Sequence, residues 1–443
     1  MAVLDERSAK KLCDIMLGAA MVPELVVSIR DRRSGNTRFA RNEVTTEGDV
    51  ETLEISVTAS IQGRTATATG NRSDKTSLQA LVAEAEELAA LSPENPEHVA
   101  PIGKSAYLQV KRFDKTTSKL DAKGRAKQVE ESIAAADDAD LELAGFFEHH
   151  EQSLTIATSA GGFAHHVSTD ATLTTTCRTR DQLGSGWAGR ESHRVADIEA
   201  GAVTAMAAEK ADISSETQAL DPGKYLVILE PQAVADLLSF LTGSLDARAA
   251  DEGRSYFSNP DGGSRLGEEL FHTSISLRSD PADADNPASP FAGDGQAHKI
   301  VSWIKDGVLE NLTRTRYWAD KSGQPAIPRP SSVLLDGDEL ELIDLVRAVD
   351  KAVMVTRFWY NRMLDPRSIL VTGLTRDGTF LVEQGKITTA IRNFRYNDSP
   401  LTMLNNVLAL GKPQRVVTRG GQVMVVPPMV VKDFNFSSSS DAV

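Results

Sequence analysis

Residues 358–378 read FWYNRMLDPRSILVTGLTRDG and run on into TFLVEQGKI, and this stretch is the main guide to the fold. It combines three aromatic residues, several basic residues and a glycine-containing turn within a short distance. Thr379–Glu383 followed by Gln384-Gly385 predicts a strand that ends in a hairpin turn. A globular core does not require this mixture of residues. The mixture therefore predicts one surface built on a β-rich C-terminal part.

The composition is that of a globular protein with several units. The chain has 443 residues, of which 41% are hydrophobic and 25% charged, and roughly 150 residues per domain gives about three units. With 62 acidic and 48 basic residues the net charge is −14. An acidic surface repels phosphate backbones, so we expect no direct contact with nucleic acid.

Cysteine content and hydropathy indicate the compartment. Cys13 and Cys177 are far apart, so they predict neither a disulfide framework nor a cysteine zinc site, and they fit a reducing compartment. No run of about 18 apolar residues occurs that could span a membrane. The N-terminus lacks the apolar core of a signal peptide. We therefore expect a cytoplasmic protein without membrane contact.

Hydrophobic periodicity predicts an α+β fold, with an N-terminal α/β part of antiparallel strands and helices and a C-terminal β-rich domain. The predicted units are 1–105, 106–215 and 216–436, followed by a disordered tail at 437–443. Predicted helices cover 77–91, 120–137, 195–211, 233–250 and 400–410. The central strands are predicted as the short segments 146–150, 153–159, 163–168 and 171–178.

Several short motifs, in order, resemble one known family. They are TRFARN at 37–42, QGR at 62–64, GSGWAG at 184–189, DPGKYLVILEP at 221–231 and KDGVL at 305–309. Together with residues 358–378 they resemble the TldD/PmbA family of bacterial and archaeal "modulator of DNA gyrase" proteins. That family includes zinc metallopeptidases and their partner subunits.

The resemblance implies a metal site whose ligands are missing here. The family's peptidases carry an HExxxH run on the helix after the VILEP-like strand, and a further cysteine ligand near the C-terminus. The matching run is SFLTGS, in which Ser239 and Ser244 replace the histidines and Phe240 replaces the glutamate. No cysteine follows Cys177. A hydroxyl is a poor zinc ligand and phenylalanine cannot accept a proton, so we expect no catalytic residue, no metal and no cofactor.

The resemblance therefore implies a TldE-like, non-catalytic subunit. Its partner would be a TldD-like zinc peptidase subunit that alone carries the zinc, and the pair would degrade unfolded peptides. Two alternatives stay open. One is a homo-oligomeric peptide-binding protein without catalysis, and the other is a metallopeptidase with unrecognised ligands such as His272.

One cluster is a candidate peptide-binding wall: Trp359, Tyr360, Arg362, Arg376 and Asp377. In that interpretation the arginines pair with a carboxylate and the aromatic rings stack on side chains. The alternative is an aromatic plug in the β-rich core, with arginine–aspartate pairs that hold a turn. The sequence alone does not decide between a cleft and a core.

Other signals have simpler interpretations. Residues 184–189 match GxGxxG, but the expected helix begins too late for a dinucleotide site, so we expect glycines that permit close backbone approach. The pairs His149-His150 and His165-His166 are expected to be exposed on strands. Asp280, Asp283 and Asp285 lack the register of a calcium loop. The apolar run VMVVPPMV at 423–430 predicts an edge strand covered in an oligomer.

Overall fold

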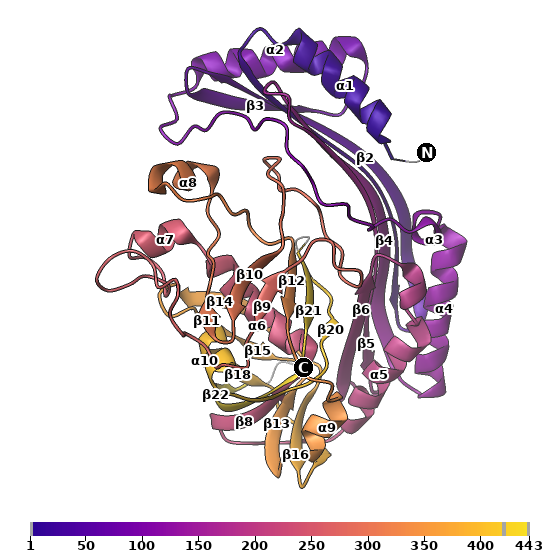
Figure 1. Cartoon of the computed structure of the whole chain (residues 1–443). Helices are drawn as coiled ribbons and strands as arrows, with labels where there is room; N and C mark the ends of the chain where they lie inside the picture. Colours follow the sequence, from indigo (N-terminus) through magenta and orange to yellow (C-terminus); the bar gives the residue numbers. More distant parts are fainter. Residues whose placement is uncertain (1–2, 419–421, 441–443) are drawn as a thin grey trace.

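The structure is a computed structural model that describes residues 3–418 and 422–440. Its N-terminal part is one antiparallel sheet with the strand order β3-β2-β1-β4-β5-β6. Four of these strands are long, and the sheet arches over the rest of the molecule (Figure 1). Its strands are β1 Glu24–Ala40, β2 Glu43–Ile61, β3 Arg64–Gly70, β4 Glu142–Thr158, β5 Phe163–Arg178 and β6 Ser185–Ser192.

Helices cover only the convex face of this sheet (Figure 1). Period-two alternation places residues such as Val27 and Val57 in a core with α1 and α2, while Phe147 and Leu173 pack with α4 and α5. The opposite, concave face carries polar side chains and faces the C-terminal part. The helices are α1 Glu6–Ala19, α2 Lys75–Leu91, the short α3 Lys115–Ser118, α4 Ala122–Asp138 and α5 Ala200–Ile213.

Two predicted strand breaks in the central region are wrong. Residues 146–150 and 153–159 belong to the single strand β4, and 163–168 and 171–178 belong to β5. Polar residues at these points, Glu151 and Gln152 on β4 and Thr169 and Asp170 on β5, suggested the breaks, but the pairing of the two strands continues through them. The helix predicted at 195–211 is a short 3-10 turn, Val195–Asp197, followed by α5.

The C-terminal part contains two sheets. One has the order β11-β10-β9-β12-β21-β20, and the other runs β14-β15-β18-β22-β8-β13-β16-β17-β7, with β19 paired to β22. The first comprises β9 Leu277–Ser279, β10 Val301–Lys305, β11 Val308–Leu309, β12 Ser332–Leu335, β20 Gln414–Arg415 and β21 Val423–Val426. The second comprises β7 Thr217–Gln218, β8 Gly223–Leu229, β13 Lys351–Val355, β14 Phe358–Asp365, β15 Leu370–Thr375, β16 Thr379–Glu383, β17 Lys386–Ile391, β18 Phe394–Asp398, β19 Val407–Leu410 and β22 Met429–Ser439.

Helix α6, Pro231–Ser244, contacts strands of both C-terminal sheets, namely β8, β14 and β21. Its apolar residues, including Leu237, Leu238 and Leu241, belong to the largest core cluster. The helix predicted at 233–250 is therefore two helices, and the one predicted at 400–410 ends early because Val407–Leu410 pairs with β22. The remaining helices are α7 Ala247–Asp251, α8 Arg316–Ser322, α9 Leu342–Arg347 and α10 Pro400–Asn405.

Two expectations about the C-terminal residues need correction. Ser437–Ser439 are part of β22, where Ser438 and Ser439 pair with β18, so the predicted disordered tail does not begin at 437. Residues 441–443 of that tail lie outside the described residues. The run 423–430 is not an exposed edge, because β21 lies between β12 and β20 while Met429 and Val430 are buried in β22.

The predicted division near residue 105 remains a prediction, and one sheet runs across it. The fold class, α+β with antiparallel strands and helices before a strand-rich C-terminal part, is confirmed. Among the described residues, no helix is both long and apolar enough to cross a membrane.

Candidate functional site

A cavity of about 910 Å³ lies where the concave face meets the C-terminal part. Its floor comes from alternate residues of β4, β5 and β6, and its roof from α6, the start of β14 and the residues around β21. The floor residues are Phe146, Glu148, Thr172, Thr174, Thr176 and Trp187. The roof includes Gln232, Ala235, Asp236, Ser239, Phe240, Arg357, Phe358, Trp359, Tyr360, Asn361, Val417, Thr418, Gln422 and Met424.

Strand alternation explains the polar floor. On β5, Leu173 and Cys177 are fully buried under the helices, so Thr172, Thr174 and Thr176 point to the opposite face. Each threonine presents a hydroxyl that can both donate and accept a hydrogen bond. The floor therefore offers a row of hydrogen-bonding hydroxyls beside the apolar surfaces of Phe146 and Trp187.

The degenerate motif residues lie on α6 beside this cavity. Ser239 is exposed and its hydroxyl donates to the Asp236 carbonyl at 2.9 Å, while the Ser244 hydroxyl donates to the Phe240 carbonyl at 2.7 Å. Both hydroxyls thus bond to the backbone of their own helix, and Phe240 forms part of the cavity wall. These three residues do not fit a zinc ion, which needs neutral nitrogen, thiolate or carboxylate ligands.

The candidate replacement ligand His272 lies elsewhere. It is exposed, its Nδ1 lies 2.9 Å from the Ser274 hydroxyl, and it is not among the residues that line the cavity. Across residues 3–418 and 422–440, no group of three or more His, Cys, Asp or Glu side chains converges as a metal site would require.

A stack of aromatic rings and arginines forms one end of the cavity. The Arg357 guanidinium lies 4.7 Å from the Trp187 ring centroid and 5.0 Å from that of Trp359, so it is sandwiched between two indoles. Arg376 lies 5.7 Å from the Trp359 ring centroid. Such contacts are favourable because the ring face is electron-rich. This stack joins β6 to β14 across the boundary between the two parts.

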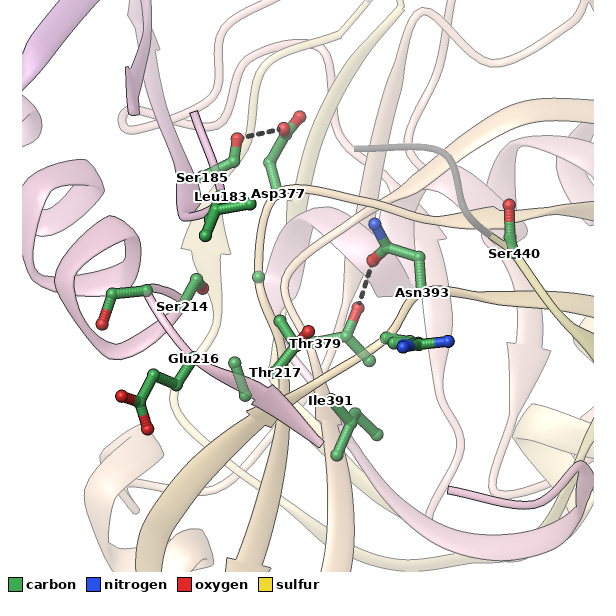
Figure 2. Close-up of a pocket in the computed structure, with 14 residues that line it drawn as sticks. Leu183, Ser185, Ser214, Glu216, Thr217, Asp377, Thr379, Ile391, Asn393 and Ser440 are labelled. Carbon is green, nitrogen blue, oxygen red and sulfur yellow. Dashed lines mark hydrogen bonds between the residues drawn. The ribbon is translucent and has the colours of Figure 1, made fainter. Parts of the chain in front are cut away.

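Asp377 anchors the stack from behind. Its carboxylate forms an ion pair with Arg357, lies 3.6 Å from Arg376 and accepts a 2.6 Å hydrogen bond from the Ser185 hydroxyl. Burial lowers the pKa of Arg357, while Asp377 opposes that shift. In Figure 2, Ser185 and Asp377 point toward one another at the edge of a separate pocket of about 440 Å³ that plays no part in the sites described below.

The structure places only two of the five predicted binding residues at the cavity. Trp359 and Tyr360 line the cavity. Asp377 is 4% exposed and pairs with arginine, which matches the alternative interpretation in which arginine–aspartate pairs hold a turn. Arg362 is exposed and Arg376 half-buried, and neither lines the cavity. Arg357, which directly precedes residues 358–378, was not predicted as a site residue. The sequence feature that could have identified it is a basic residue directly before two aromatic residues, Phe358 and Trp359.

Tyr360 has a strained backbone at the cavity wall. Its φ of 54° is unusual for a bulky residue, and it lies in an irregularity of the pairing between β14 and β15. The side chain is 66% exposed. Backbone strain of this kind costs on the order of 1–3 kcal/mol and concentrates at functional sites.

The glycines of 184–189 serve packing, as expected. A Cβ at Gly186 would lie 2.1 Å from the Ala207 carbonyl oxygen, and one at Gly184 would lie 2.4 Å from that of Ala211. Glycine thus lets β6 lie directly against α5.

The expectation that the four histidines are exposed is wrong, because His150 and His165 are half-buried and the other two are buried. His149 and His166 are 7% and 8% exposed, and burial lowers the pKa of each to about 4. Both are therefore neutral at pH 7. They lie within the long strands β4 and β5, where neighbouring elements cover them.

A known protein family matches the C-terminal part of the chain. The sequence model of the PmbA/TldA metallopeptidase C-terminal domain matches residues 222–438. A search of the curated proteins found no significant match.

Solved structures share the fold over nearly the whole chain. A candidate modulator of a DNA gyrase from Thermotoga maritima is 17% identical with a TM-score of 0.85, covering 97% of this chain and 100% of that one. TldE from Thermococcus kodakarensis is 14% identical with a TM-score of 0.85, covering 96% and 99%. A candidate modulator of DNA gyrase from Bacteroides thetaiotaomicron is 18% identical with a TM-score of 0.83, covering 98% and 99%.

Proposed function

Since the chain belongs to the TldD/PmbA family through its C-terminal domain, we propose that it is a non-catalytic, TldE-like subunit of a peptidase complex. In that complex a TldD-like subunit carries the zinc and cleaves unfolded peptides. This chain binds peptide and helps to enclose it.

The observation that carries the proposal is the state of α6. The helix keeps its apolar packing and its position beside the cavity, but residues 239, 240 and 244 offer only hydroxyls bonded to the helix backbone and a phenyl ring. No residue among these three can hold zinc or take a proton from a metal-bound water. The fold of a metallopeptidase domain is thus retained without the groups for its chemistry.

The cavity supports a role in peptide binding. Threonine hydroxyls on the floor offer hydrogen bonds to any polypeptide backbone, whatever its side chains. Trp359 and Tyr360 on the roof offer flat faces for side-chain stacking. This combination favours extended, unfolded chains because folded proteins have few free backbone groups.

A native pull-down from the source cell tests the proposal. The tagged full-length chain should retain a homologue with an intact HExxxH motif, and the pair should contain zinc and cleave unstructured peptides in a chelator-sensitive manner. The chain purified alone is the control and should not cleave. Recovery of only the chain itself, as a homo-oligomer, would favour the alternative of a peptide-binding protein without catalysis.

A further inference from the structure

A second cavity, of about 610 Å³, continues from the first along the concave face. Ser239 and Gln422 line both cavities, so the two meet beside α6. The floor of the second cavity comes from Ser28 and Arg30 on β1 and from residues 154–156 on β4. In the sheet register Arg30 pairs with Leu154 and Ser28 pairs with Ile156, so this floor is one continuous surface.

The charged side chains that line the second cavity are both arginines. Arg30 and Arg329 line it, both are exposed, and neither forms an ion pair with any residue that the structure describes. No Asp or Glu is among the lining residues, although the chain as a whole carries a net charge of −14. Glu54 lies opposite Arg30 in the sheet register but forms no ion pair with it. Two arginines without an ion pair attract anions, and the arginine fork matches a carboxylate.

The His298 ring in this cavity contributes no charge at neutral pH. Its Nδ1 lies 2.8 Å from the Ser289 carbonyl oxygen, so that nitrogen carries the proton. The ring is 7% exposed, and burial lowers its pKa. The positive field of the cavity therefore comes from the two arginines and persists as the pH rises above 7.

The first cavity has the opposite character. Glu148 and Asp236 line it, and its single lined arginine, Arg357, is already paired with Asp377 outside the lining. A hydrogen bond with His150 lowers the pKa of Glu148, so this carboxylate is ionised at pH 7. The joined cavities thus run from an acidic end to a basic end.

The spacing of the two ends sets the length of a ligand. Glu148 lines the first cavity and Leu154, the register partner of Arg30, lines the second on the same strand, and their separation of six positions corresponds to about 20 Å at roughly 3.3 Å per residue. An extended peptide of about seven residues covers that distance.

We propose that the two cavities form one groove that binds an extended peptide in a single direction. The C-terminal carboxylate pairs with Arg30 and Arg329, and the N-terminal ammonium lies at the end formed by Glu148 and Asp236. This inference rests on the peptide-binding role proposed above and adds to it a direction, a length and a preference for free termini.

Binding of fluorescent-labelled heptapeptides to the full-length chain tests the proposal, with the label in the middle of the peptide. Amidation of the C-terminus should weaken binding to the wild-type chain about tenfold, in keeping with a charge-assisted bidentate contact. In the variant Arg30→Gln/Arg329→Gln the acid and the amide should bind equally. Arg38→Gln is the matched control, because Arg38 is also exposed on β1 but lines neither cavity.

The outcomes separate this inference from the proposed function. If the wild-type chain binds acid and amide heptapeptides equally, the orientation is wrong while peptide binding stands. If the wild-type chain binds no peptide, both fail. N-terminal acetylation provides an independent check, since it should weaken binding in the wild type and in the double arginine variant alike. Circular dichroism confirms that each variant is folded.

Discussion

Replacing Asp377 with alanine should destabilise the protein by leaving a buried charge without its partner. The side chains of Asp377 and Arg357 are 2% and 14% exposed, and the guanidinium is enclosed by Trp187 and Trp359. Arg376, at 3.6 Å from the carboxylate, carries the same positive charge as Arg357, so it cannot compensate for the loss of Asp377. The Ser185 hydroxyl loses its acceptor in the same variant.

The magnitude follows from these contacts. Removing one partner of a buried ion pair costs about 3–5 kcal/mol, and the lost Ser185 hydrogen bond adds about 1 kcal/mol. The Arg357 side chain is 14% exposed, so water partly solvates the stranded charge and keeps the total cost near the lower end of this range. We expect the free energy of unfolding to fall by about 3 kcal/mol. The double variant Asp377→Ala/Arg357→Met should recover part of this loss, because no charge is then stranded.

Urea unfolding measures the effect with tryptophan fluorescence and far-ultraviolet circular dichroism. Trp187 and Trp359 flank the pair, so fluorescence reports on this boundary, and coincident transitions would justify a two-state treatment. Glu383→Ala is the matched control, because its ion pair with Lys351 is exposed and should contribute less than about 1 kcal/mol. A loss below about 1 kcal/mol for Asp377→Ala, or no recovery in the double variant, would refute the reasoning.

Three further predictions concern other parts of the chain. The triple variant Ser239→His, Phe240→Glu, Ser244→His should show no chelator-sensitive peptide cleavage, because a metal site also needs its remaining ligand and oriented supporting groups. His166, whose pKa burial lowers to about 4, should make the free energy of unfolding fall between pH 6.5 and 4 by up to about 3 kcal/mol, since only the unfolded chain takes up the proton there. His166→Gln should reduce this fall but not abolish it, because His149, whose pKa is also lowered to about 4, still contributes. Gly186→Ala should cost about 1–3 kcal/mol in urea unfolding, because a Cβ would meet the backbone of α5.

A matched variant controls for the glycine measurement. Gly243→Ala, on α6 with no atom within 4 Å of the added Cβ, should be neutral or stabilising, in contrast to Gly186→Ala. Cleavage by the triple variant, an unchanged pH curve in His166→Gln, or equal effects of the two glycine variants would each contradict the corresponding prediction.

Local patterns in the sequence were sufficient for many elements. Helix α2 and strand β21 follow directly from hydrophobic periodicity, and both are confirmed. The long strands β4 and β5 were divided because polar residues such as Glu151 and Asp170 interrupt the hydrophobic pattern, although strand pairing continues through them. Which partner covers an apolar strand is a tertiary property, and β21 is covered within its own sheet.

The candidate site was predicted only in part, because its residues come from segments that are far apart in the sequence. The motif alignment placed Ser239 and Phe240 on a helix, and the structure places that helix beside the cavity. Arg357 and Trp187 are far apart in sequence, and only the fold stacks them together. No local pattern indicates that two distant segments will meet, so the cation–π stack required the structure.

Zinc content, measured together with peptide cleavage, tests the central claim most directly. The purified full-length chain should contain far less than one zinc per chain by elemental analysis and should not cleave unstructured peptides, because residues 239, 240 and 244 supply no ligand or base. Close to one zinc per chain, lost in His272→Ala together with cleavage, would contradict the account and establish the chain as a metallopeptidase with different ligands.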